Sequence, residues 1–200
     1  MTEARIGRLV AASLHQAILD ILPQRLDFYE EWLHPDGLRD GSIGLAPITA
    51  VIGFLRTERD AYGRVMTRAG SLAAEWTVLS MSGLSRRFVT ALPRALRARA
   101  AMRIAKGLIR DVNSLSAVKT RVRRDLVRLD VRSSLFCASR ERQARPLCGF
   151  YVAATLETLS RFGLPAQAQV EECRAMAAGT CVMTFRLSGA RVEEDPALAA

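Results

Sequence analysis

The sequence predicts an α+β fold, in which a helical N-terminal two-thirds packs on a small antiparallel sheet. As far as Val112, apolar residues recur every three or four positions, which is the period of an amphipathic helix. From Val118 onward, apolar residues alternate with charged ones over short stretches, which is typical of half-buried strands. The 200 residues suffice for one domain with a substantial core. We therefore expect a single domain over residues 1–187 and a polar, frayed tail over residues 188–200.

Four helical segments are predicted before the middle of the chain. The first ends ahead of Pro23, because proline cannot continue a helix. A turn at His34–Gly37 separates the second segment from the third, whose first turn holds Pro47. Asp60 is placed to cap the fourth. In order, the segments cover residues 6–21, 26–33, 47–55 and 60–81.

One basic helix, one later helix and two hairpins complete the predicted fold. The basic helix runs from Arg86 to Val112 and is expected to bend at Pro93. The first hairpin turns at Arg124–Asp125, where two alternating stretches meet. The later helix is apolar on one face and stops at Gly163–Pro165. The other segments are strands at 118–123 and 128–132, a helix at 147–162, and strands at 168–174 and 182–187.

The formal net charge of +9 raises the question of an anionic partner. Nearly all of the positive charge is arginine, since Lys106 and Lys119 are the only lysines. The densest basic stretch, Arg94–Arg124, has no interleaved aromatic residues on which bases could stack. The favoured interpretation is a solvated helix face followed by a charged hairpin turn. Binding of an anion or a nucleic acid by this stretch is the alternative.

The sequence gives no indication of a membrane span, a secretory signal or an active site. No apolar stretch approaches the ~20 residues that cross a bilayer. Arg5 and Arg8 interrupt the N-terminal apolar residues at helical spacing, unlike a signal peptide, so we expect a cytoplasmic protein. His15 and His34 share no catalytic motif, and no glycine-rich phosphate loop occurs. We therefore expect no catalytic residues, and an enzyme is not predicted.

The last third of the chain contains four cysteines, which are Cys137, Cys148, Cys173 and Cys181. Cys173 and Cys181 fall on neighbouring predicted strands, and Cys148 falls at a helix start, where the helix dipole favours a thiolate. Glu171 or Glu172 could add an oxygen ligand. Three thiolates and one carboxylate would form a closed, structural zinc site. From the spacing alone, buried cysteines without a metal are the favoured alternative.

The stretch from Val131 to Leu187 resembles the 4-vinyl reductase domain. Three features carry the resemblance: the strand end Ser133–Phe136, the helix entry Pro146–Tyr151, and a final hairpin that contains Glu-Glu-Cys and Gly179. That domain has the fold of the TRAPP vesicle-tethering subunits, a ligand-binding fold of NO-signalling and Golgi-transport proteins. The resemblance covers about the last third of the chain.

The resemblance implies a homodimer with a hydrophobic pocket between helices and sheet. Relatives of that family include the sensor domains of phenol-responsive bacterial activators and a protein of bacteriochlorophyll biosynthesis. In those sensors a zinc ion is held by cysteines and a glutamate in this region. Carried over by position, the thiol ligands are Cys148, Cys173 and Cys181. The family glutamate falls on Val170 in this chain, and Glu171 is the nearest substitute.

Five aromatic residues are candidates to line a ligand pocket, and the alternative is that they fill the core. They are Tyr62, Trp76, Phe136, Phe150 and Tyr151. The function we expect is that of a bacterial module that binds a hydrophobic, aromatic or isoprenoid-like molecule and acts by sequestration, delivery or sensing. The alternatives are an accessory protein of tetrapyrrole pigment or lipid biosynthesis, and an anion- or nucleic-acid-binding protein that uses Arg94–Arg124.

Overall fold

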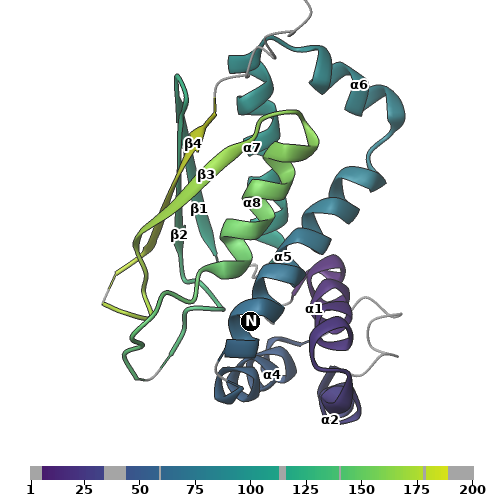
Figure 1. Cartoon of the computed structure of the whole chain (residues 1–200), viewed down its shortest axis with the longest axis vertical. Helices are drawn as coiled ribbons and strands as arrows, with labels where there is room; N and C mark the ends of the chain where they lie inside the picture. The colour runs from purple at the N-terminus through teal and green to yellow at the C-terminus, as the bar shows by residue number, and fades with distance from the viewer. Residues whose placement is uncertain are drawn as a thin grey trace, which may run out of the picture.

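The helices lie beside and below a four-stranded antiparallel sheet, which confirms the predicted α+β class (Figure 1). The structure is a computed structural model that describes residues 6–33, 44–58, 60–112, 116–139, 141–177 and 179–188. The turn expected at His34–Gly37 lies outside the described residues, as do residues 189–200 of the expected tail.

The order of helices and strands follows the prediction closely. The helices are α1 (Arg8–Ile21), α2 (Leu26–Leu33), α4 (Leu45–Thr57), α5 (Asp60–Ser80), α6 (Gly83–Ala91), α7 (Arg94–Val112) and α8 (Gly149–Arg161). The strands are β1 (Ala117–Arg123), β2 (Leu126–Arg132), β3 (Ala166–Glu172) and β4 (Cys181–Leu187). None of the described helices is both long enough and apolar enough to cross a membrane. The cytoplasmic location stays a prediction.

One predicted helix proves to be two. The segment expected to run from Arg86 to Val112 with a bend is divided into α6 and α7. Leu92 between them has the extended conformation (φ −64°, ψ 147°), because Pro93 disfavours helical dihedrals in the residue before it. The start also differs: Ser82 caps α6 by accepting a hydrogen bond from the Ser85 N–H, so the helix begins at Gly83 and not at Arg86.

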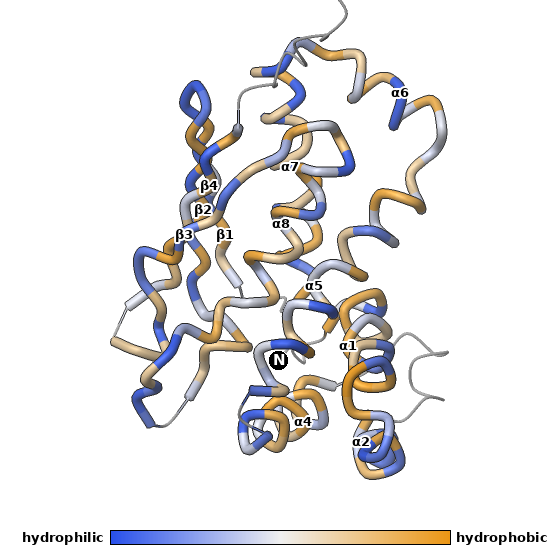
Figure 2. The backbone as a smooth tube through the Cα atoms, viewed as in Figure 1, coloured by the Kyte–Doolittle hydropathy of each residue, from blue (hydrophilic) through white to orange (hydrophobic). Residues whose placement is uncertain are grey.

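The sheet has the order β1-β2-β4-β3, with every neighbouring pair antiparallel. Arg124 at the β1–β2 turn has a positive φ of 51°, and the turn is strongly hydrophilic (Figure 2). The β2–β4 pairing joins the two hairpins and sets Val131 opposite Cys181. Helix α7 packs against β1 and α8 packs against β3. The first residue of β4 is thereby placed close to the C-terminal end of β2.

Helices α5 and α8 approach each other closely at Gly70. A Cβ atom at this position would lie 2.3 Å from the carbonyl oxygen of Phe150 and 3.1 Å from the Cβ of Ala153. Backbone atoms cannot move aside as a flexible side chain can. Glycine is therefore required where α5 crosses the first turn of α8, and this crossing holds Cys148 and Phe150 in place.

Gly70→Ala is expected to lower the free energy of unfolding by about 1–3 kcal/mol, because overpacking forces α8 away from α5. Urea unfolding followed by circular dichroism measures the change. Gly63→Ala on the same helix is the matched control, since no atom lies within 4 Å of its added Cβ. Alanine favours the helix, so the control should gain about 0.5–1 kcal/mol. Equal effects at the two positions would contradict the close helix contact.

Candidate metal centre

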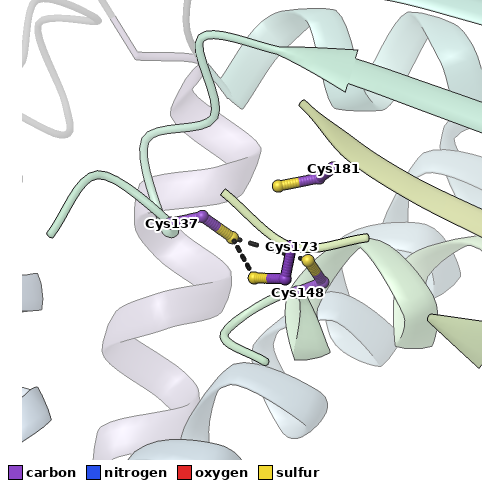
Figure 3. Close-up of side chains that lie close together, drawn as sticks. All are labelled: Cys137, Cys148, Cys173 and Cys181. Carbon is purple, nitrogen blue, oxygen red and sulfur yellow. Dashed lines mark hydrogen bonds between the residues drawn. The ribbon is translucent and has the colours of Figure 1, made fainter. Parts of the chain in front are cut away.

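All four cysteines of the chain meet at one buried point. The sulfur atoms of Cys137, Cys148, Cys173 and Cys181 lie within 4.8 Å of one another, and each residue is buried and free of a disulfide. Figure 3 shows the four side chains pointing toward one another from separate segments of the chain. Thiols gathered in this way could bind one metal ion, since thiolates are metal ligands.

Each cysteine reaches this point from a different element. Cys137 lies in the turn after β2, where its N–H donates a hydrogen bond to Ser134 Oγ at 3.2 Å. Cys148 is the N-cap residue of α8. Cys173 directly follows β3, and Cys181 is the first residue of β4. The cluster thus connects both hairpins to the N-terminus of α8.

Arg56 on α4 holds the turn that carries Cys137. Its guanidinium donates to the carbonyl oxygen of Phe136 at 2.8 Å and to that of Ala138 at 2.9 Å. The hydroxyl of Tyr62 donates to the same Phe136 carbonyl at 3.1 Å. The backbone on both sides of Cys137 is therefore fixed by side chains from α4 and α5, although the turn itself has no regular structure.

The sulfur–sulfur distances match a four-thiolate metal site better than a disulfide. Cys137 Sγ lies 3.5 Å from Cys148 Sγ and 3.7 Å from Cys173 Sγ. A disulfide bond is only about 2.05 Å long. A tetrahedral ion with metal–sulfur bonds of about 2.3 Å sets its sulfurs roughly 3.8 Å apart. These two separations are therefore close to those of sulfurs that share one ion, and all four sulfurs lie within 4.8 Å of one another.

The thiols of the cluster differ in acidity. Hydrogen bonds from the other three thiols lower the pKa of Cys173, and the N–H of Leu147, 3.4 Å from its sulfur, lowers it further. The pKa of Cys148 is raised, chiefly by its hydrogen bond with Cys137 and further by those with the other two thiols and by burial. Cys173 is therefore the first of the two to become a thiolate, which is the form that binds metals.

Glu171, the carboxylate expected beside the cysteines, lies elsewhere. It occupies an exposed position on β3, and its carboxylate pairs with Arg128 at 3.2 Å. The fourth group at the cluster is instead Cys137, which the sequence argument counted but gave no role. The only indication of this in the sequence was the presence of a fourth cysteine. No local pattern predicts the turn or the β2–β4 pairing that places Cys137 near Cys181.

The five candidate pocket aromatics do not form one group. Phe136, Phe150 and Tyr151 are fully buried and pack against one another, with ring centroids 4.6 Å apart for Phe136–Phe150 and 5.4 Å apart for Phe136–Tyr151. Ser134 Oγ also donates to the Tyr151 hydroxyl at 3.0 Å. Tyr62 joins this group through its hydrogen bond to Phe136, whereas Trp76 lies half-buried further along α5. The three packed rings form a wall beside Cys137 and Cys148.

Comparison with known proteins identifies the fold through structure only. No protein-family model matches the sequence, and no curated protein gives a significant match. The solved structures that resemble this one include the H-NOX protein of S. oneidensis in the Fe(II)NO state, with 13% identity and a TM-score of 0.54, covering 92% of this chain and all of that one. The unliganded Fe(II) H-NOX protein of K. algicida has 7% identity and a TM-score of 0.53, covering 92% and 97% of the two chains.

Two expectations drawn from the family resemblance are corrected by these comparisons. The assignment to the 4-vinyl reductase domain and TRAPP subunits is wrong, because the structural neighbours are H-NOX proteins and no family model matches. The expectation of structural zinc is contradicted as well, because those neighbours are iron proteins, described in Fe(II) states. The three features between Val131 and Leu187 that carried the resemblance were too few to separate one family from another.

The described residues do not fit the haem that the neighbouring fold implies. Haem iron needs an axial ligand, most often histidine. His15 is the only histidine in the described part of the chain, and its Nε2 lies 2.7 Å from Glu30 Oε1 on the facing helix α2. The cysteines, which could also bind iron, contact one another instead. Within the described residues, the one histidine is therefore engaged with a carboxylate and the cysteines lie together in a separate cluster.

Proposed function

We propose that this chain is a binding module whose resident cofactor is one metal ion of the kind that prefers sulfur ligands. The four ligands are Cys137, Cys148, Cys173 and Cys181. The observation that carries the proposal is the convergence of four buried thiols at the spacing of a tetrahedral site. A set of four thiolates around one ion leaves no open position on that ion for a substrate.

The position of the cluster would let one bound ion join several segments of the chain. An ion bound there would connect the turn after β2, the start of α8 and the beginning and end of the β3–β4 hairpin loop. These segments have few other hydrogen bonds that cross between them, such as the Gln143 N–H to the Ala175 carbonyl at 2.8 Å. Binding would also replace S–H···S contacts, which are weak, with metal–sulfur bonds, and would release the thiol protons.

Metal analysis of freshly purified protein tests the proposal. We expect inductively coupled plasma mass spectrometry to find one metal ion per chain. The mass of the native protein should exceed that of the denatured protein by the mass of this ion. Reconstitution with Co²⁺ should give the thiolate-to-cobalt absorption of a four-sulfur site. Glu171→Gln should leave the metal content unchanged, because this carboxylate lies outside the cluster. A metal-free chain with four thiols that fail to bind Co²⁺ would refute the proposal.

We also propose that the module binds a hydrophobic small molecule, as the sequence predicted. The packed aromatics at the cluster do not support this role, but a hollow of about 570 Å³ between α6 and α7 does. Its volume lies in the range of small-molecule sites, roughly 300–1,000 Å³. Native mass spectrometry of the purified protein would detect a retained organic molecule. The homodimer stays a prediction, which sedimentation velocity can test.

A further inference from the structure

We propose that the groove between α6 and α7 binds a single-chain amphiphile with a carboxylate head group. The tail would lie along the apolar groove, and the carboxylate would bind Arg99 and Arg103. The proposal deepens the ligand-binding role proposed above and rests on it. The ligand would lie between α6 and α7, and neither helix carries a cysteine of the cluster.

The groove exists because α6 stands apart from the rest of the helices. Figure 1 shows α6 as an arm that connects α5 to α7 at the end of the molecule opposite α1, α2 and α4. Val89 is the only buried side chain of this nine-residue helix. Pro93 prevents α6 from continuing into α7, so the two helices meet at an angle and leave a hollow between them.

The lining of the groove is mainly apolar. Its apolar lining residues are Met81, Phe88, Val89, Leu92, Leu96, Ala100 and Ile104, and the exposed Arg99 and Arg103 line it beside the half-buried Ala100 and Ile104 of α7. Phe88 is 68% exposed and Leu96 is 46% exposed. Single exposed apolar side chains are common on protein surfaces. A contiguous group of them around a hollow is unfavourable in water and therefore indicates a binding surface. Figure 2 shows the mixed hydrophobic and hydrophilic character of α6.

Arg99 and Arg103 give the groove a positive edge. They lie one helical turn apart on α7, where like charges repel each other. Within the described part of the chain, no acidic side chain forms an ion pair with either one. A carboxylate between two guanidinium groups would remove this repulsion and accept paired hydrogen bonds.

The charges also argue against other occupants. A second copy that placed its own α6 and α7 against the groove would bring the same cations, since α6 has no acidic residue and α7 has only Asp111 near its end. A nucleic acid would satisfy the arginines but has no long apolar tail for Leu92 and Ile104. A free amphiphile with one carboxylate satisfies both the apolar walls and the positive edge.

Calorimetric titration with dodecanoate, below the concentration at which it forms micelles, tests the proposal on the full chain. We expect one molecule bound per chain, and at least tenfold weaker binding of dodecyltrimethylammonium, which has the same tail and a positive head. The double variant Arg99→Gln/Arg103→Gln should weaken dodecanoate binding at least tenfold. Phe88→Ala should weaken the binding of both amphiphiles. These side chains are exposed, so circular dichroism should confirm folded variants.

A matched control removes two positive charges elsewhere. Arg121→Gln/Arg123→Gln on β1 changes the net charge equally but lies outside the groove. Dodecanoate binding that falls equally in both double variants, or in neither, overturns the proposal, as does binding to phosphatidylglycerol vesicles without binding of dodecanoate. If dodecanoate does not bind but the native mass contains another apolar molecule, the carboxylate assignment fails while the ligand-binding role stands. If neither is found, both fail.

Discussion

Cys173→Ser is expected to remove the metal ion and to lower the free energy of unfolding by about 4 kcal/mol, which is what a ligand contributes at roughly 1,000 times its Kd. The cluster lowers the pKa of the Cys173 thiol, as it does that of Cys181, and the Cys173 sulfur also accepts a hydrogen bond from the Leu147 N–H. Serine offers a smaller, harder oxygen that remains protonated. Three thiolates would then hold the ion incompletely, and its affinity should fall steeply.

Urea unfolding with and without a strong chelator separates metal loss from a packing defect. The unmodified chain should lose a similar free energy of unfolding when chelator is added, whereas the Cys173→Ser variant should be insensitive to it. Glu171→Gln should behave like the unmodified chain. If the chelator leaves the unmodified chain unchanged and Cys173→Ser costs less than about 1 kcal/mol, the four thiols are simply packed together and bind no structural ion.

The sequence was informative where local patterns decide the structure. Helical spacing located α1, α5 and α8, and the alternation around Arg124–Asp125 located the first hairpin. The sequence analysis predicted a bend at Pro93, whereas the structure has two helices there. Pro93 alone could have predicted this separation, because proline disfavours helical dihedrals in the residue before it. The pairing of β2 with β4 was not visible, since it joins segments some 50 residues apart through contacts that no local pattern records.

The candidate site shows the same difference between local patterns, which the sequence reveals, and long-range pairing, which it does not. Cys148, Cys173 and Cys181 could be brought together from a helix start and one hairpin. Cys137 required the β2–β4 pairing, which sets the end of β2 beside Cys181. Glu171 follows the side-chain alternation of β3, in which Gln167 and Gln169 are also exposed, so its direction was readable from strand period alone.

Phe136→Ala is expected to lower the free energy of unfolding by about 3–5 kcal/mol, because the ring is fully buried and its loss leaves a cavity. The cavity would open between Phe150 and Tyr151, directly beside Cys137. The Phe136 carbonyl would keep its hydrogen bonds from Arg56 and Tyr62, since these involve only the backbone. Metal binding should therefore survive in this variant, but with lower affinity, because the packing beside the turn is lost.

Urea unfolding and Co²⁺ titration of the variant measure the two effects separately. Phe88→Ala makes the same truncation at an exposed site and should change the free energy of unfolding by no more than about 0.5 kcal/mol. The comparison also decides between the two roles considered for the aromatic residues. Rings that line an open ligand pocket can be shortened at little cost in stability, whereas rings that support the cysteine cluster cannot. A Phe136→Ala variant as stable as Phe88→Ala, with unaltered Co²⁺ affinity, would mean that the aromatic wall does not support the cysteine cluster.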